Sequence, residues 1–341
     1  MGANRTLYID VAKIVAIFLV LVNHTNSEIF LSYSPSVTWF SSLTYFYISR
    51  IAVPVFLMAT GALLLGRVEG YRRHLQRMWR MFAVLLVFSL FYYNMNPGFP
   101  GSLSEAGTVI KSLIEKPASN ALWYVYLYLC LLMVMPFLQR LVQALEKRDI
   151  EIVIIISLAV MGLSMALGHI FSVNIYGQTD FTLFCYPIGY LFAGYYINRF
   201  IVPDRKLLVA AIIVFIACII FSDLISYQQF SQGFAQYLFW SNLGLLNISL
   251  PSIAAFYIFR HIASLPAIQK RSRLIGEVSL CVFGIYLTSD FVLVRTHPWY
   301  QDLAHFLHIF FACICWQAII FTLCLVPVFL ARRVKWVARY L

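Results

Sequence analysis

The first apolar stretch of the chain, residues 7–31, contains Asp10, Lys13 and His24 among its ionisable side chains. An α-helix rises about 1.5 Å per residue and completes a turn in about 3.6 residues, so Lys13 and His24 face the same way, about 16 Å apart along the axis. Asp10 lies near the same face, one turn before Lys13. Ionisable groups inside hydrocarbon cost several kcal/mol unless they face protein or a water-filled cavity, so this stripe predicts a lined pathway or a site.

His24 is the candidate for chemistry in this stretch. An imidazole titrates near neutral pH and can take a proton from a hydroxyl group, which makes His24 a candidate general base. A plainer interpretation is a histidine that is hydrogen-bonded at the membrane interface. Asp10 and Lys13, at positions i and i+3, can likewise be read as a local ion pair. That pair leaves unexplained why both residues lie inside an apolar span and on the face of His24.

A further buried cation, Arg50, lies in the middle of the apolar run 39–66 and needs a partner. Pro54 has no backbone N–H, so a carbonyl group near residue 50 loses its helical hydrogen bond, and Gly61 allows another helix to approach closely. Arg50 therefore either caps broken backbone or organises a site for an oxyanion or a carboxylate.

An arginine cluster follows this run, formed by Arg72, Arg73, Arg77 and Arg80. Such clusters commonly set membrane topology or contact anionic lipid headgroups. Guanidinium groups also bind phosphate through two parallel hydrogen bonds, so the cluster equally suits a phosphorylated ligand.

Later polar and aromatic residues have plainer interpretations. Trp123, Tyr124 and Tyr126 are typical of an aromatic belt at the membrane interface. Asp290 falls in the outer half of its span, where a solvated helix end would explain it.

The elements that must position these residues are membrane helices. Of the 341 residues, 62% are hydrophobic and 11% are charged, which is typical of a polytopic membrane protein. Apolar stretches long enough to cross a bilayer core of roughly 30 Å lie at 7–31, 39–66, 79–95, 121–139, 150–170, 181–198, 207–226, 236–259, 277–294 and 305–331. We therefore expect an all-α fold of about ten transmembrane helices in a single domain, residues 1–341. The seven cysteines show neither a disulfide framework nor a zinc-ligand spacing, and we expect no metal.

The distribution of basic residues predicts the orientation in the membrane. The net charge is +11, and nearly all of the 25 Lys and Arg residues fall in alternate loops. The opposite loops contain only Lys111, Lys116 and Arg295. The positive-inside rule then places both termini in the cytoplasm, and it explains the charge without a nucleic-acid partner.

Several motifs resemble, in order, those of the integral-membrane acyltransferase family 3. They are R-x4-D-x2-K-x10-H from Arg5 to His24, R-x2-VP-x-F from Arg50 to Phe56, RMWR at 77–80, LWYVYLYL at 122–129 and GIYL at 284–287. The chain departs from the family where it has Thr60-Gly61 in place of Ser-Gly. It also has Leu287-Thr288-Ser289 where the family ends its late motif in Leu-Ile-His, so it lacks the late histidine.

The resemblance implies an activity and roles for several residues. His24 would be essential, Lys13 would be the basic residue that marks the first helix, and Arg77 and Arg80 would handle the acyl donor. Members of the family use cytoplasmic acyl-CoA, commonly acetyl-CoA, to acylate hydroxyl groups of extracytoplasmic glycans or related acceptors.

We therefore expect an O-acyltransferase, in the simplest case an O-acetyltransferase, in the cell inner (plasma) membrane. The residues we expect in the site are His24 as general base, Arg50 for the oxyanion, Lys13 and Asp10 along the pathway, and Arg72, Arg73, Arg77 and Arg80 for acyl-CoA. The expected partners are a glycan or lipid-linked saccharide, which is the acceptor, and the membrane lipids that surround the protein. The sequence is compatible with direct transfer of the acyl group from the donor to the acceptor and with an intermediate in which His24 carries the acyl group. A homodimer is compatible with the sequence, which does not determine the oligomeric state.

Two other classes of function account for the same residues. A proton-coupled transporter or flippase would use the intramembrane charges as a path, but it does not need the arginine cluster. Such a transporter also predicts paired half-sequences with broken helices, which the sequence does not show. A non-catalytic sensor or assembly partner is the other alternative.

Overall fold

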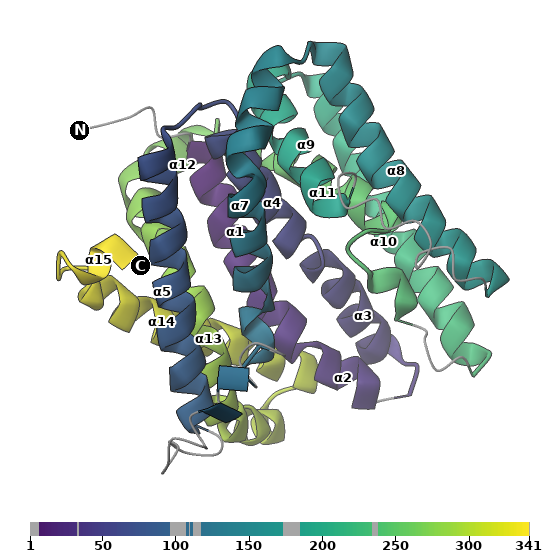
Figure 1. Ribbon diagram of the computed structural model, residues 1–341. Coiled ribbons are helices and arrows are strands. Elements are labelled where there is room, and N and C mark those ends of the chain that lie inside the picture. The colour runs from purple at the N-terminus through teal and green to yellow at the C-terminus, as the bar shows by residue number, and fades with distance from the viewer. Residues whose placement is uncertain are drawn as a thin grey trace.

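The computed structural model describes residues 7–32, 34–95, 107–108, 110–111, 117–172, 185–233 and 238–340. All the regular elements within these ranges are helices (Figure 1). Inside hydrocarbon the backbone must satisfy its own hydrogen bonds, and long apolar runs do so as helices. Arg5, the first residue of the motifs, lies outside the described residues.

Nine helical segments of the described chain are long and apolar enough to cross a membrane. They are α1 (Leu7–Thr25) with α2 (Ser27–Ser32), α3 (Val37–Ser49) with α4 (Ala52–Leu64), α5 (Tyr71–Met95), α7 (Trp123–Ala144), α8 (Lys147–Phe171), α10 (Arg205–Ser231), η4 (Phe239–Ser241) with α11 (Leu246–Ile262), α13 (Ser272–Phe306) and α14 (Ile309–Ala331). Three short helices lie in connections or near the C-terminus, namely η1 (Asn120–Leu122), α12 (Pro266–Gln269) and α15 (Val337–Tyr340). The chain is an all-α, multi-pass membrane protein.

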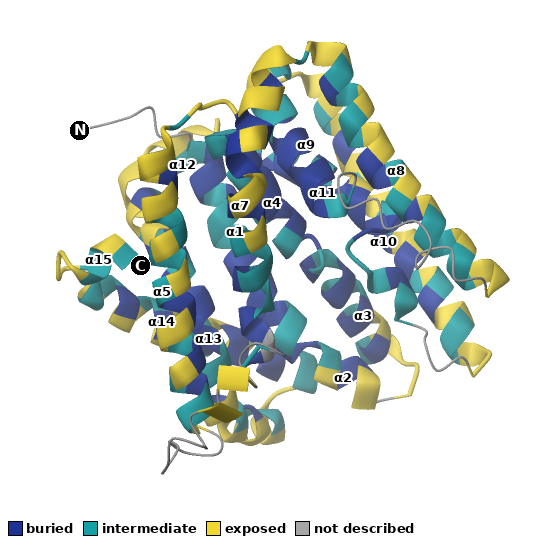
Figure 2. Ribbon diagram, viewed as in Figure 1, coloured by how far each residue is buried: buried dark blue, intermediate teal, exposed yellow. Residues whose placement is uncertain are grey.

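The expected span at 181–198 forms a shorter helix, α9 (Tyr186–Phe200), and residues 181–184 lie outside the described ranges. Its 15 residues rise about 22 Å, less than the roughly 30 Å of a bilayer core. This helix is nonetheless mostly buried, whereas α8 and α10 expose much of their apolar surface (Figure 2). A helix enclosed by protein does not need to match the thickness of the lipid.

Two glycines bring α9 against α4. A Cβ atom at Gly61 would lie 1.9 Å from the carbonyl oxygen of Leu191, and one at Gly194 would lie 1.9 Å from the carbonyl oxygen of Met58. Only glycine allows two helix backbones to approach this closely. The prediction that Gly61 admits a neighbouring helix is confirmed, and the neighbour is α9.

The run 39–66 is interrupted at Arg50, which caps the C-terminus of α3. The N–H of Arg50 donates to the carbonyl oxygens of Phe46 and Tyr47, at 3.2 and 3.1 Å. Pro54 has no N–H to donate to the carbonyl oxygen of Arg50 four residues earlier. The chain therefore breaks its helix here and resumes as α4, which places the Arg50 side chain at the junction.

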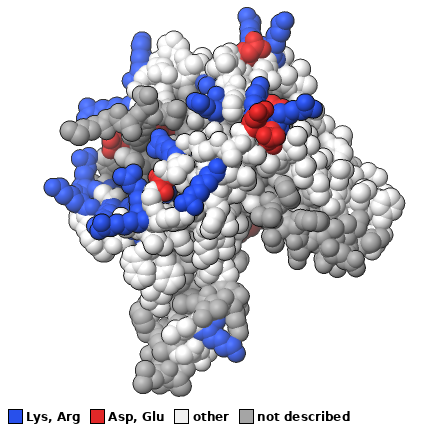
Figure 3. Space-filling model, turned by 45° about the horizontal axis from the view of Figure 1, so that its top comes forward, with Lys and Arg blue, Asp and Glu red and all other residues white. Residues whose placement is uncertain are grey.

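Helix α1 lies in the middle of the bundle and packs against α4, α11 and α13 (Figure 1). Its charged stripe is consequently enclosed by protein rather than lipid, which avoids the cost of placing ionisable groups in hydrocarbon. Lys and Arg side chains gather over the end of the molecule at which α5 and α8 begin (Figure 3). This is the end that the positive-inside rule assigns to the cytoplasm.

Candidate functional site

Two adjoining cavities lie beside α1. The large cavity has a volume of about 470 Å³ and is lined by α1, α4, α5, α7, α13 and the segment that follows α14. The small cavity, about 200 Å³, is lined by the last turn of α1 and by residues at the α3–α4 junction, among others. The two cavities have Val20, Val53, Tyr124 and Tyr286 in common, so they meet at these four side chains.

His24 lines the small cavity and lies in the last turn of α1. The next residue, Thr25, fixes this turn because its hydroxyl donates to the carbonyl oxygen of Leu21 at 2.7 Å and accepts from Gln317 Nε2 of α14 at 2.8 Å. Within the described ranges the imidazole makes no hydrogen bond of its own. A positioned histidine that lines a cavity and is not engaged elsewhere is available to a substrate.

Arg50 lines the same small cavity. Its Nε–H donates to the carbonyl oxygen of Ser241 at 2.8 Å, and Nη1 donates to Asn23 Oδ1 at 2.8 Å. No carboxylate in the described part of the chain pairs with it. Arg50 thus caps backbone, but that of η4 and not the carbonyl freed by Pro54. It also faces the cavity beside His24 without a carboxylate partner among the described residues, which the other interpretation requires.

The structure separates the four arginines that the sequence grouped. Arg77 lines the large cavity, pairs with Glu69 at 2.9 Å and has a buried Nη1 without a hydrogen-bond partner among the described residues. Arg80 lines neither cavity, and its Nη1 donates to the carbonyl oxygen of Arg339 at 3.4 Å. Arg72 and Arg73 are exposed and line neither cavity.

Sequence reasoning missed two arginines of the large cavity, Arg332 and Arg339, which it counted only as topological charges. The segment after α14 folds back so that both line the cavity together with Arg77 and Lys13. Asp and Glu are absent from the described residues that line it. The cavity is therefore positively charged and favours an anionic ligand.

Asp10 and Asp290 have different places from those expected. Asp10 is buried, accepts a hydrogen bond from the hydroxyl of Ser279 at 2.5 Å and lines neither cavity, so it joins α1 to α13. Asp290 is not at a helix end, because it lies inside α13, and its carboxylate accepts a hydrogen bond from the hydroxyl of Ser119. Asp290 follows Tyr286 by four residues and so lies on the same face of its helix. This spacing was the signal in the sequence that Asp290 faces the interior of the bundle.

The aromatic-belt interpretation is wrong for two of its three residues. Trp123 lines the small cavity, and Tyr124 lines both cavities, whereas Tyr126 lines neither. Tyr124 lies edge-on to Tyr286 of α13, with ring centroids 6.0 Å apart. Residues near a helix entry can thus belong to a site when the entry is covered by other helices.

Comparison with protein families identifies the class. The family model described as an acyltransferase domain matches residues 6–331 of the chain. The chain belongs to this family and is a membrane acyltransferase, as its motifs predicted. The comparisons with curated proteins and with solved structures give no match.

Proposed function

We propose that the protein moves an acyl group, acetyl in the simplest case, from cytoplasmic acyl-CoA to a hydroxyl group of an extracytoplasmic glycan or lipid-linked saccharide, within the cell inner (plasma) membrane. One observation carries the proposal. A cationic cavity adjoins a second cavity that contains His24 and Arg50, and α1 borders both. This arrangement provides separate places for a donor and for an acceptor, joined where the reaction would occur.

The large cavity suits the donor. Arg77, Arg332 and Arg339 offer guanidinium groups that bind phosphate, and CoA carries several phosphate groups. A pantetheine arm spans about 15–20 Å, by analogy with an extended chain of about six residues. The rise of α1 between Lys13 and His24 is about 16 Å. A donor anchored at the arginines therefore brings its thioester to the neighbourhood of His24.

The small cavity supplies the groups for acyl transfer. His24 takes the proton of the acceptor hydroxyl, whose oxygen then forms a bond to the thioester carbonyl carbon. Arg50 stabilises the negative charge that develops on the carbonyl oxygen. The tetrahedral intermediate collapses by breaking the carbon–sulfur bond, and the departing CoA thiolate accepts the proton from His24. The acceptor leaves as an ester and CoA leaves as a thiol.

Mass spectrometry of envelope glycans tests this function. Cells that express the wild-type chain are compared with cells that lack it and with cells that express the Arg50→Gln variant. We expect an acyl increment on a glycan or lipid-linked saccharide in the wild type only. An identical glycan profile in all three strains would refute the assigned acceptor class.

A further inference from the structure

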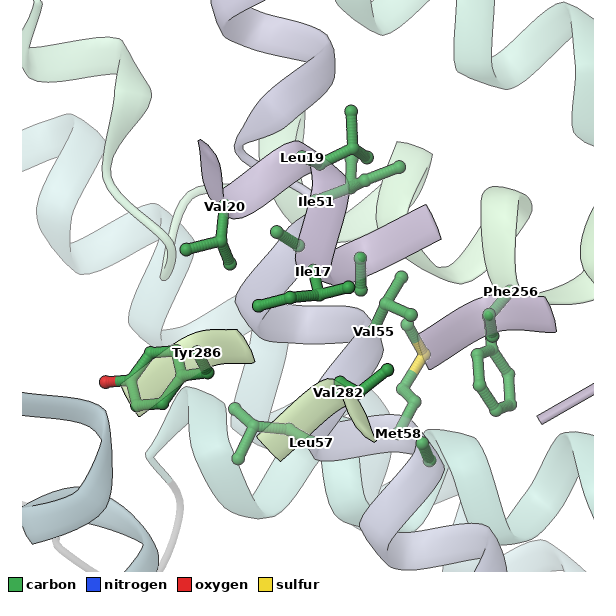
Figure 4. Packing of buried hydrophobic residues seen from close by; sticks show 14 of the residues in the cluster. Ile17, Leu19, Val20, Ile51, Val55, Leu57, Met58, Phe256, Val282 and Tyr286 are labelled. Carbon is green, nitrogen blue, oxygen red and sulfur yellow. The ribbon is translucent and has the colours of Figure 1, made fainter. Parts of the chain in front are cut away.

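Part of the lining of the large cavity is apolar. Val20 of α1 and Val282 of α13 line it and belong to the buried hydrophobic cluster (Figure 4). Aliphatic side chains such as these have no donor to offer a phosphate group. The position of an anionic donor in this cavity therefore depends on the basic side chains of the lining and on the groups that hold them in place.

Arg77, one of these basic residues, is held by a carboxylate that is not part of the lining. Its Nη2 donates to Oε1 of Glu69 at 2.9 Å, and Arg77 lines the large cavity whereas Glu69 does not. The other terminal nitrogen, Nη1, is buried and has no hydrogen-bond partner among the described residues. Within the described part of the chain, Glu69 thus makes the only hydrogen bond to this guanidinium group.

Glu69 itself has a defined position. It lies in the connection between α4 and α5, and Gln139 of α7, which is buried, contacts both ends of this connection. Gln139 Nε2 donates to the carbonyl oxygen of Leu64 at 3.0 Å, and Gln139 Oε1 accepts a long hydrogen bond of 3.5 Å from the N–H of Glu69. One buried side chain therefore ties Glu69 to the end of α4, which is itself part of the cavity lining.

The Glu69–Arg77 pair differs from an ion pair at the protein surface. Its side chains are 11% and 21% exposed, whereas those of the Lys147–Glu151 pair, 3.9 Å apart, are 55% and 40% exposed. Exposed pairs hold their side chains weakly, because water competes for both charges. Removal of one partner of an enclosed pair instead leaves the other charge unpaired, which is costly. We therefore expect Arg77 to leave its place when Glu69 is neutralised.

We propose that Glu69 is a positioning residue that keeps the Arg77 guanidinium group in the lining of the donor cavity, where it binds a phosphate group of acyl-CoA. The inference rests on the proposed function, which assigns CoA to this cavity. Its effect is opposite in sign to that of charge alone. Glu69 is a negative charge beside a cationic cavity, so charge alone predicts that its removal strengthens the binding of an anionic donor. Positioning predicts that its removal weakens this binding.

The test measures CoA thiol released from acetyl-CoA by membrane vesicles that contain the protein, after subtraction of vesicles without it. Glu69→Gln removes the charge and nearly preserves the size of the side chain. We expect it to raise KM for acetyl-CoA about tenfold, the scale of one charge-assisted hydrogen bond. It should change kcat little, because a phosphate group remote from the thioester is bound equally in the ground state and the transition state.

Glu151→Gln is the matched control, because Glu151 also belongs to an ion pair at this end of the molecule but lines neither cavity. It should leave KM unchanged. Glu69→Gln is also measured in the Arg77→Gln background, where it should leave KM unchanged because no guanidinium group is left to hold. Glu69→Asp keeps the charge but shortens the side chain, so it should raise KM by less than Glu69→Gln does.

The value of KM does not depend on the amount of folded protein, so partial loss of a variant leaves the comparison valid. If Glu69→Gln does not fold, Glu69→Asp decides the question, because charge alone predicts no change in its KM. A KM that falls or stays unchanged in the Glu69 variants, or that rises equally with and without Arg77, would overturn the positioning role alone. Absence of CoA release by the wild type would instead refute the proposed function, and the positioning role with it.

Discussion

At the scale of single residues, the site brings together side chains of unlike origin. His24 and Lys13 come from one helical face, whereas Arg50 reaches the small cavity from a helix break and is held by Asn23. Asn23 precedes His24 in the chain. One turn of α1 therefore supplies both the candidate base, His24, and the side chain that accepts a hydrogen bond from Arg50. A displacement of this turn would therefore disturb both groups at once.

Replacement of His24 tests its role directly. We expect His24→Ala to lower acyl-CoA-dependent turnover about 10²- to 10⁴-fold, because a general base contributes this much and the imidazole faces a cavity rather than a packed core. Turnover is measured as CoA thiol released in membrane vesicles. The control is His169→Ala, because His169 stacks on Phe239 and lines neither cavity. Unchanged turnover in His24→Ala would remove His24 from the mechanism.

The arginine cluster offers a charge-matched comparison. Arg77→Gln/Arg80→Gln should weaken acyl-CoA binding, because Arg77 faces the large cavity and Arg80 contacts the segment that carries Arg339. Loss of a charge-assisted hydrogen bond costs about 1.5–3 kcal/mol, or roughly ten- to hundredfold in affinity. Arg72→Gln/Arg73→Gln removes the same charge from exposed side chains and should leave affinity unchanged.

Titration calorimetry of purified protein with acetyl-CoA compares the two arginine variants. Measurement at two salt concentrations separates specific contacts from general attraction, since salt screens exposed charges. Equal weakening in both pairs would show that the cluster acts only through its total charge.

At the scale of elements, the contact between α4 and α9 determines where the α3–α4 junction lies. The two glycines place backbone against backbone, and α4 in turn carries Val53 and lines both cavities. A short, buried α9 thus acts as a support for the helix that borders the site. The separation of these two helices is an element-scale property on which the position of α4 beside both cavities depends.

Gly61→Ala should destabilise the protein. An alanine gains up to about 1 kcal/mol of helix propensity, but a Cβ atom 1.9 Å from the carbonyl oxygen of Leu191 forces the helices apart. Overpacking typically costs about 1–3 kcal/mol, occasionally more, so the clash outweighs the gain. The measurement is the thermal unfolding midpoint in detergent, with Gly70→Ala as control because a Cβ there meets no atom within 4 Å. An unchanged midpoint in Gly61→Ala would show that α4 and α9 are not in close contact.

At the scale of the whole molecule, the large cavity is lined by segments that are far apart in the chain. Lys13 comes from the first helix, and Arg332, Arg339 and Tyr340 come from the C-terminal segment. Such a cavity forms only when the complete bundle has assembled. A single domain over residues 1–341 stays a prediction for the full chain.

Cysteine labelling tests the orientation predicted from charge. The two exposed native cysteines, Cys130 and Cys315, are first replaced by Ser. A membrane-impermeant thiol reagent added outside should modify Ser34→Cys, which lies between α2 and α3, and should modify Lys335→Cys only after permeabilisation. Both positions are exposed. The reverse pattern would place the cationic cavity outside the cell and exclude a cytoplasmic donor.

The sequence by itself determined the class of the protein. Its apolar runs predicted an all-α membrane bundle, its motifs predicted an acyltransferase, and both predictions are confirmed. It also placed His24 and Lys13 on one face and a helix break at Arg50, because helical periodicity and the missing N–H of Pro54 are local properties.

Only the tertiary structure decided which charges share a cavity. Arg77 lines the large cavity whereas Arg72 and Arg73 do not, and Arg332 lines it from the other end of the chain. Asp10 lines neither cavity although it shares the helix of Lys13, and it accepts a hydrogen bond from Ser279, which does line the large cavity. These outcomes depend on contacts between helices far apart in the chain, and such contacts are set by the packing of whole faces rather than by the spacing of neighbouring residues.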